Sequence, residues 1–230
     1  MNKLYYRKVA AIITAAGDGT RMGGISKPLI KIGEKTAFEL VLDAFCGSEY
    51  IGEIIVACKD ETPLAQLAAK YPLPVKFVQG GKTRSESVFA AVSAVSKDMS
   101  VYAIHDCARP LIQTAVVDRL IEAAIEDGAS CASCAVSDTI KYKSKDGTIK
   151  TPNRESLFAV QTPQVFLRDI YIVAMALAKK NRYTATDDTS LVEKAGFKVN
   201  YVDCPEPNIK LTNPQDIEIA NVLTGFCHQI

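Results

Sequence analysis

The chain has 230 residues, of which 48% are apolar, and its formal net charge is +1. This balance argues against a general nucleic-acid or membrane-surface binder, because such proteins need a broad basic face. No apolar run approaches the roughly 18 residues of a membrane span, and no signal-peptide core follows the short polar start.

The chain contains seven cysteines, an odd number, and most of them lie in apolar segments. This usage predicts reduced thiols and a cytoplasmic location. Cys131 and Cys134 form a C-x-x-C pair inside an apolar run, without a second pair or a nearby histidine. We therefore favour two core cysteines over a redox or metal site.

Hydrophobic periodicity predicts alternating strands and helices. The expected strands cover residues 9–13, 53–58, 75–78, 101–105, 129–136 and 198–202. The expected helices cover residues 36–45, 62–70, 84–95, 113–126, 167–180 and 189–194, and a last helix starts at Asn213-Pro214. This pattern predicts an α/β fold, with a mostly parallel sheet covered on both faces, as one domain of residues 1–230. Ligands of such sheets bind beyond the carboxyl ends of the strands.

Residues 139–151 interrupt the alternation. Alternating residues flank Asp146-Gly147, which predicts a hairpin with a two-residue turn. This hairpin holds too few apolar side chains to fold alone. We expect a projecting arm over residues 138–156 that packs on a second subunit, with a solvated surface hairpin as the alternative.

The loop after the first strand, residues 15–27, combines several glycines with Arg21 and Lys27. Glycines let backbone N–H groups approach a phosphate, and the two cations meet the remaining charge. Met22 stands where a dinucleotide fingerprint needs its third glycine, and the Walker A pattern is absent. The loop resembles the one with which nucleotidyltransferases wrap a nucleoside triphosphate.

Two further loops follow strands. Asp106 ends the fourth strand, where it is well placed for Mg²⁺, an ion that prefers one or two carboxylates plus phosphate oxygens. Arg109 follows and could take an acceptor phosphate, although a buried Asp–Arg pair would explain both residues. His105 points to the opposite face, so we expect a structural role for it. Gly80-Gly81 precede a helix start that could meet a base or phosphate, and a capping box explains part of that motif.

Together the motifs are similar to those of the 2-C-methyl-D-erythritol 4-phosphate cytidylyltransferase family. The matching runs are AAGDGTRM at 15–22, Lys27, GGxxRxxSV at 80–88, HDCARP at 105–110, QTPQ at 161–164, TDD at 186–188 and NIKLT at 208–212. They follow the family's order and span nearly the whole chain. Two positions depart from it: Pro28 follows Lys27 where glutamine is frequent, and Lys82 replaces a frequent acidic residue.

The resemblance implies a Rossmann-like nucleotidyltransferase fold and a homodimer joined through the arm. It also implies transfer of CMP from CTP to methylerythritol phosphate, with Mg²⁺ and release of pyrophosphate, in non-mevalonate isoprenoid synthesis. The implied catalytic cations are Arg21, Lys27, Lys210 and Arg154, and Asp106 would hold the metal. The implied nucleotide-binding positions are Ala15, Ala16, Gly17, Gly19, Gly81 and Ser87. The implied acceptor contacts are Arg109, Thr139, Thr162 and Thr186, with Thr139 and Arg154 reaching the partner subunit's site.

Two alternatives stay open. A cytidylyltransferase for another polyol phosphate, such as ribitol 5-phosphate, would use the same nucleotide half, although the TDD and NIKLT runs favour methylerythritol phosphate. A nucleotide-binding regulator without catalysis belongs to a different class. The retained cations argue against it, because a sensor has no transition state to stabilise.

Overall fold

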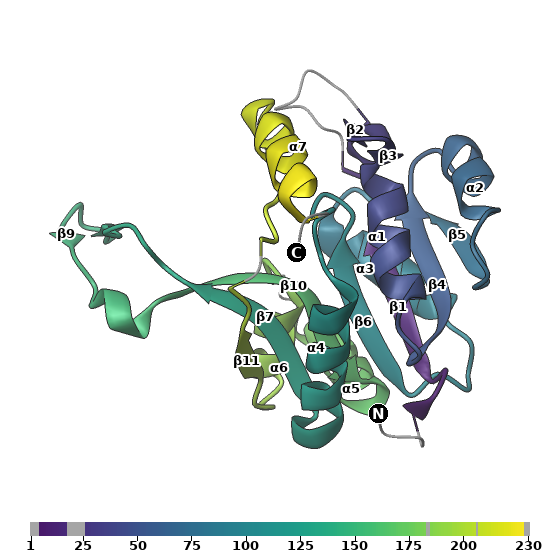
Figure 1. Cartoon of the computed structure of the whole chain (residues 1–230). Helices are drawn as coiled ribbons and strands as arrows, with labels where there is room; N and C mark the ends of the chain where they lie inside the picture. The colour runs from purple at the N-terminus through teal and green to yellow at the C-terminus, as the bar shows by residue number, and fades with distance from the viewer. Residues whose placement is uncertain (1–4, 18–25, 183–184, 206, 228–230) are drawn as a thin grey trace.

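The computed structural model describes residues 5–17, 26–182, 185–205 and 207–227 (Figure 1). Within these ranges the main sheet has seven strands in the order β11-β7-β10-β6-β1-β4-β5. The strands are β1 (Val9–Thr14), β4 (Ile51–Cys58), β5 (Val75–Gln79), β6 (Val101–Asp106), β7 (Ala129–Ala135), β10 (Phe158–Leu167) and β11 (Asn200–Asp203). Only β10 runs antiparallel to its neighbours in this described sheet, so the expectation of a mostly parallel sheet is confirmed.

Helices cover both faces of the sheet (Figure 1). They are α1 (Ala37–Cys46), α2 (Thr62–Ala68), α3 (Arg84–Ser93), α4 (Thr114–Asp127), α5 (Arg168–Asn181), α6 (Asp188–Lys194) and α7 (Gln215–Cys227). Along β1, Ala11 and Ile13 pack with α1, α2 and α4, whereas Ala10 and Ile12 pack with α3, α5 and α6. This alternation follows from the two-residue repeat of a strand buried on both faces. None of the described helices has the length and apolar character that crossing a membrane would need.

Two helices start with the reciprocal caps that their sequences predict. Thr36 accepts a hydrogen bond from the Glu39 amide before α1, and Thr83 accepts one from the Glu86 amide before α3. In each case the glutamate side chain accepts in return from the amide of the capping residue. The start of α3 is therefore held firmly, and this end of the helix lines the pocket described below.

Strand β10 is the main element that the sequence reading missed. Pro163 and the polar Gln161 and Gln164 interrupt its apolar pattern, and a proline argues against a central strand. The structure accommodates them with a break in the β7 ladder between Val160 and Gln164, where the Thr162–Pro163 peptide is cis. As a result, Thr162 is buried in the middle of the sheet next to β6.

A small third layer lies beside α7. Strands β2 (Lys31–Ile32) and β3 (Lys35–Thr36) form a short hairpin that packs against this helix. Ile32 and Ala220 are buried there, and Asn221 accepts a hydrogen bond from the Gly33 amide at 2.7 Å. This layer holds the chain segment that carries Lys210 against the rest of the protein.

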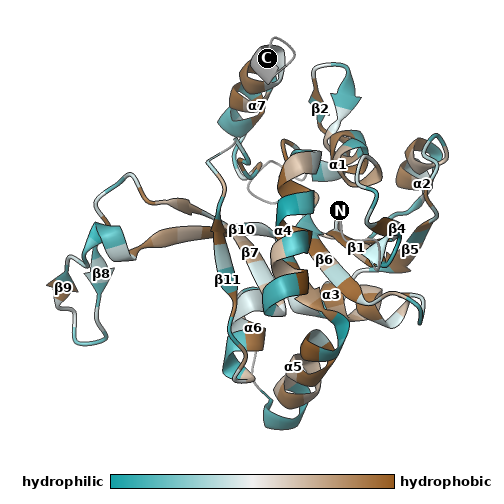
Figure 2. Ribbon diagram, turned by 60° about the horizontal axis from the view of Figure 1, so that its bottom comes forward, coloured by the Kyte–Doolittle hydropathy of each residue, from teal (hydrophilic) through white to brown (hydrophobic). Residues whose placement is uncertain are grey.

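The expected arm projects from the body between β7 and β10, with β8 (Tyr142–Lys143) and β9 (Ile149–Lys150) near its tip (Figure 1). The predicted two-residue turn is wrong: Ser144 and Thr148 pair across a three-residue loop, and Gly147 has a φ of +87°. Glycine suits that position because it adopts a positive φ without the steric cost that other residues meet. The tip loop is hydrophilic (Figure 2), yet Tyr142 and Ile149 are 58% and 65% exposed.

Candidate functional site

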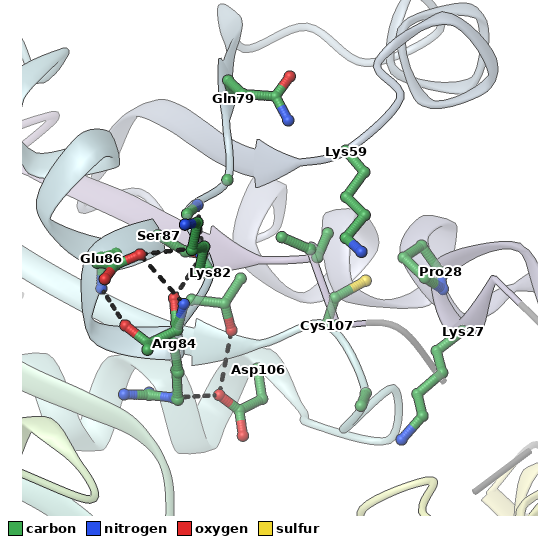
Figure 3. A pocket seen from close by; sticks show the side chains of 18 of the residues that line it. Lys27, Pro28, Lys59, Gln79, Lys82, Arg84, Glu86, Ser87, Asp106 and Cys107 are labelled. Atoms are coloured by element: carbon green, nitrogen blue, oxygen red, sulfur yellow. Dashed lines mark hydrogen bonds and ion pairs between the residues drawn. The ribbon is translucent and has the colours of Figure 1, made fainter. Parts of the chain in front are cut away.

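A cavity of about 1080 Å³, the large pocket, opens at the carboxyl ends of β1, β4, β5 and β6. Its wall consists of the loops that follow these strands and the short turn at Lys27 (Figure 3). The side chain of Lys210 also lines it. This is the edge at which parallel α/β sheets bind ligands. The cavity therefore lies at the edge where the strand pattern predicts the ligand site.

Main-chain contacts hold the loops of the large pocket close together. The Gly80 amide donates to the Cys58 carbonyl at 2.8 Å, and a Cβ on Gly80 would lie 2.3 Å from that of Ala16. Only glycine fits this approach. Ser87 accepts a hydrogen bond from the Gly81 amide at 3.1 Å and donates to the Thr83 carbonyl, so its side chain orders the second glycine loop.

Lys27 and Lys59 line the large pocket on the side opposite Arg84 (Figure 3). Lys27 opens a short 3-10 turn with Pro28, and its Nζ donates to the Leu211 carbonyl at 2.8 Å. The sequence departure at Pro28 therefore still leaves Lys27 in the pocket wall. Lys59 follows β4 directly and was missed; its position after a buried strand was the available signal.

Asp106 lies at the centre of a charged cluster at the end of β6. Its Oδ1 accepts from Arg84 Nε at 2.9 Å and from Thr14 at 3.1 Å, and its Oδ2 accepts from Lys210 Nζ at 2.6 Å. Burial alone would raise the pKa of Asp106, but Arg84 and Lys210 outweigh burial and bring the pKa below its usual range. The carboxylate therefore stays ionised.

Arg84, the first residue of α3, is a site residue that the sequence reading did not single out. Its signal was the arginine in the run GGxxRxxSV. Its Nη1 donates to Asp188 Oδ2 at 2.5 Å while Nε contacts Asp106. Burial lowers the pKa of Arg84, but the two carboxylates raise it overall above its ordinary value.

A second cavity of about 390 Å³, the small pocket, lies between β10 and the start of α6. Its lining includes Gln161, Thr162, Thr186, Asp187 and Arg109. Three residues line both cavities: Arg84, Asp106 and Lys210. The two pockets therefore meet at one group of charged side chains.

Arg109 gives the small pocket a buried cation. Its Nη1 donates to the Asn208 carbonyl at 2.8 Å, but its Nε is buried without a hydrogen-bond partner among the described residues. Burial lowers the pKa of Arg109, although a guanidinium remains charged near neutral pH. Arg109 therefore places a positive charge in the wall of the small pocket, which favours an anion there.

His105 is structural, as expected, and it connects the residues of the small pocket. Its Nε2 donates to the Arg109 carbonyl at 3.0 Å, which leaves Nδ1 to accept from the Thr162 hydroxyl at 3.0 Å. Thr162 in turn accepts from the Asp106 amide at 3.1 Å. Burial lowers the pKa of His105 to about 4, so the ring is neutral at neutral pH.

The remaining predicted residues divide into three groups. Ala15, Ala16, Gly17, Gly81 and Ser87 line the large pocket, and Thr186 lines the small one. Arg21 and Gly19 lie outside the described residues. Thr139 and Arg154 are exposed on the arm, outside the lining of both pockets of their own chain.

The two cysteines of the C-x-x-C pair lie in β7. Cys131 is fully buried and Cys134 is half-buried, and both are free thiols. Burial raises the pKa of Cys131 well above its ordinary value, so this thiol stays protonated. The structure agrees with the reading of core cysteines.

A mostly parallel sheet with a glycine-lined pocket at its strand ends and an adjoining cationic pocket defines an α/β nucleotidyltransferase. The model of the family described as 2-C-methyl-D-erythritol 4-phosphate cytidylyltransferase matches residues 9–225. The chain belongs to this family.

Individual relatives agree. The enzyme of that name from Caldanaerobacter subterraneus subsp. tengcongensis is 39% identical over 221 residues, covering 93% of this chain and 97% of that protein. The crystal structure of 4-diphosphocytidyl-2C-methyl-D-erythritol synthase from Anaerococcus prevotii is 29% identical, with a TM-score of 0.85 and coverage of 94% and 96%. The crystal structure of the cytidylyltransferase from Thermus thermophilus is 31% identical, with a TM-score of 0.79 and coverage of 95% and 99%.

Proposed function

We propose that this protein transfers CMP from CTP to 2-C-methyl-D-erythritol 4-phosphate and releases pyrophosphate, a step of non-mevalonate isoprenoid synthesis. The observation that carries this proposal is the meeting of the two pockets at Arg84, Asp106 and Lys210. A reaction that joins two phosphates needs two adjoining anion pockets, and Arg84 and Lys210 supply the cations of the wall that these pockets share. Family membership supplies the identity of the two substrates.

The chemistry needs little covalent work from the protein. A phosphate oxygen of the acceptor forms a bond to the α-phosphorus of CTP, and the bond from that phosphorus to the β-bridging oxygen breaks. Pyrophosphate leaves with the electron pair. The acceptor phosphate has a second pKa of about 6, so near neutral pH it attacks without a general base. Positioning and charge stabilisation therefore supply the catalysis.

The described side chains suit these tasks. Lys27 and Lys210 line the large pocket, where they would hold the triphosphate and the charge that builds on the α-phosphate. Arg109, which lines the small pocket, would take the acceptor phosphate. Gly81 and Ser87 would border the cytidine, next to the ordered second glycine loop. Arg21 would be a further contact of the triphosphate.

Asp106 could serve as the carboxylate ligand that the protein provides to a Mg²⁺ ion. Its oxygens accept three hydrogen bonds from described residues, out of about four acceptor positions on a carboxylate. No cluster of three or more metal-ligating side chains occurs in the described part of the chain. Mg²⁺ bound to a nucleotide needs only one or two carboxylates, with phosphate oxygens and water as its other ligands. The ion would neutralise triphosphate charge.

We also propose a homodimer in which the arm of one subunit completes the small pocket of the other. The arm carries apolar side chains, including Tyr142 and Ile149, that stay more than half exposed within their own chain. Arg154 and Thr139 lie on the same arm, away from both pockets of their own subunit. A cytoplasmic location is consistent with the free cysteines among the described residues.

One assay tests the function. The protein is supplied with CTP, Mg²⁺ and either methylerythritol 4-phosphate or ribitol 5-phosphate, and pyrophosphate release is followed. Turnover with methylerythritol phosphate alone is expected. Turnover only with ribitol phosphate would replace the acceptor, and CTP binding without any turnover would favour a non-catalytic nucleotide-binding module.

A further inference from the structure

Arg84 connects two parts of the site that lie far apart in the chain and on different elements. It begins α3, whose capping box fixes the backbone from which the side chain extends. Its guanidinium lies between Asp106, at the end of β6, and Asp188, the first residue of α6. Both carboxylates are buried, with side chains 9% and 4% exposed. Arg84 thus bridges two buried acids, and Lys210 supplies the second positive charge, at Asp106.

The contact at Asp188 continues into the first turn of α6. Asp188 Oδ1 accepts from the Tyr171 hydroxyl at 2.5 Å, and its amide donates to Gln164 Oε1 at 2.9 Å. The first turn of α6 is therefore attached to α5, to β10 and, through Arg84, to the end of β6. Thr186, which lines the small pocket, precedes this turn by two residues.

We propose that Arg84 is a positioning residue that holds the start of α6, with Thr186, in register with Asp106 and thereby aligns the acceptor with the donor. The inference rests on the proposed function. Arginine suits the role because its planar fork binds two carboxylates at once, whereas the point charge of lysine does not. Displacing a substrate by about 1 Å can lower turnover by about 10²-fold.

Asp188 offers a test, because it lines neither pocket and its effect on catalysis must pass through its neighbours. Asp188→Asn weakens the ion pair with Arg84. Tyr171→Phe removes the other side-chain hydrogen bond of the same carboxylate and leaves the ion pair, so it is a matched control. Both variants are expected to unfold at a lower temperature than the unmodified protein, because each disturbs a buried polar contact.

The kinetic results are expected to differ. Asp188→Asn should lower kcat by about 10-fold to 10²-fold and raise KM for methylerythritol phosphate, with KM for CTP within about twofold. Tyr171→Phe should keep all three within about twofold. Adding Arg84→Lys to Asp188→Asn should lower kcat by less than the product of the separate effects, because both changes break one link.

The inference is overturned if Asp188→Asn changes only the unfolding temperature. It is also overturned if the decrease in kcat of the double variant equals the product of the decreases caused by Arg84→Lys and Asp188→Asn alone. Calorimetric titration separates it from the proposed function. If the unmodified protein binds CTP and methylerythritol phosphate but shows no turnover, the proposed function fails. The inference is then tested by the affinity for methylerythritol phosphate, which Asp188→Asn should weaken about tenfold and Tyr171→Phe should leave unchanged.

Discussion

The large and small pockets are neighbours, but they are built in different ways. The large pocket is formed by loops that directly follow parallel strands, and main-chain contacts such as Gly80 to Cys58 set its shape. The small pocket depends on side chains from separate segments, such as Thr162 in β10 and Arg109 after β6, which His105 connects by hydrogen bonds. The difference teaches that the large pocket, which we propose for the nucleotide, is largely a property of the sheet edge. The small pocket, which we propose for the acceptor, depends on a tertiary network.

The largest effect is expected for a residue that the two pockets share. Lys210→Ala should lower kcat/KM for both substrates by about 10³-fold, because it removes a cation from the reacting phosphates and one partner of Asp106. Steady-state kinetics with each substrate varied in turn measures this. Lys179→Ala, on the exposed face of α5, is the control. An effect confined to one substrate would show that the pockets work independently.

The second prediction concerns the completion of the small pocket by a partner subunit. Arg109→Ala and Arg154→Ala should each lower activity by about 10²-fold. When the two variants are mixed and allowed to exchange subunits, about a quarter of the sites combine an intact pocket with an intact arm, so about a quarter of the activity should return. No recovery on mixing, with exchange shown by mass spectrometry, would place both arginines in one subunit's site.

A third prediction distinguishes the backbone-built pocket. Gly80→Ala places a Cβ 2.3 Å from that of Ala16, so the two glycine-bearing loops must separate. KM for CTP should rise about tenfold while KM for the acceptor changes little. Gly225→Ala in α7, where an added Cβ meets nothing within 4 Å, is the control. An equal rise in both KM values would contradict the division between the pockets.

The smallest effect concerns the acid sensitivity of the small pocket's network. Burial lowers the pKa of His105 to about 4 in the folded protein, below its value of 6.5 in the unfolded chain. Between these values the unfolded state binds more protons, so stability falls as the pH drops from 6.5 towards 4. From pH 7 to pH 5 this amounts to about 2 kcal/mol. Urea denaturation at the two pH values should show a smaller difference for His105→Asn by about that amount. Equal differences in the two proteins would refute the assignment.

The sequence predicted the large pocket better than the small one. Apolar runs followed by glycines and charges locate strand ends, and the carboxyl ends of parallel strands share one edge whatever their order. Asp106 and Lys27 could therefore be placed at one edge from the pattern, whereas Ser87 was predicted through the resemblance to the family. Strand β10 was not predicted, because Pro163 argues against a central strand. In the folded protein, pairing with β6 and β7 on both sides overrides that local preference. The contacts of Arg84 with two carboxylates were not predicted, because an arginine next to a capping motif does not reveal which acidic side chains it contacts.

The amino-acid pattern by itself determined the alternation of strands and helices, the glycine loops at the strand ends and the hairpin that departs from the body. These are local properties, set by the two-residue and 3.6-residue repeats, by caps and by glycine. Only the tertiary structure decided the place of β10 between β6 and β7, the shared wall of the two pockets and the bridge from Asp106 through Arg84 to Asp188. Such contacts join segments far apart in the chain, and burial, which no local pattern reports, makes their charges pair.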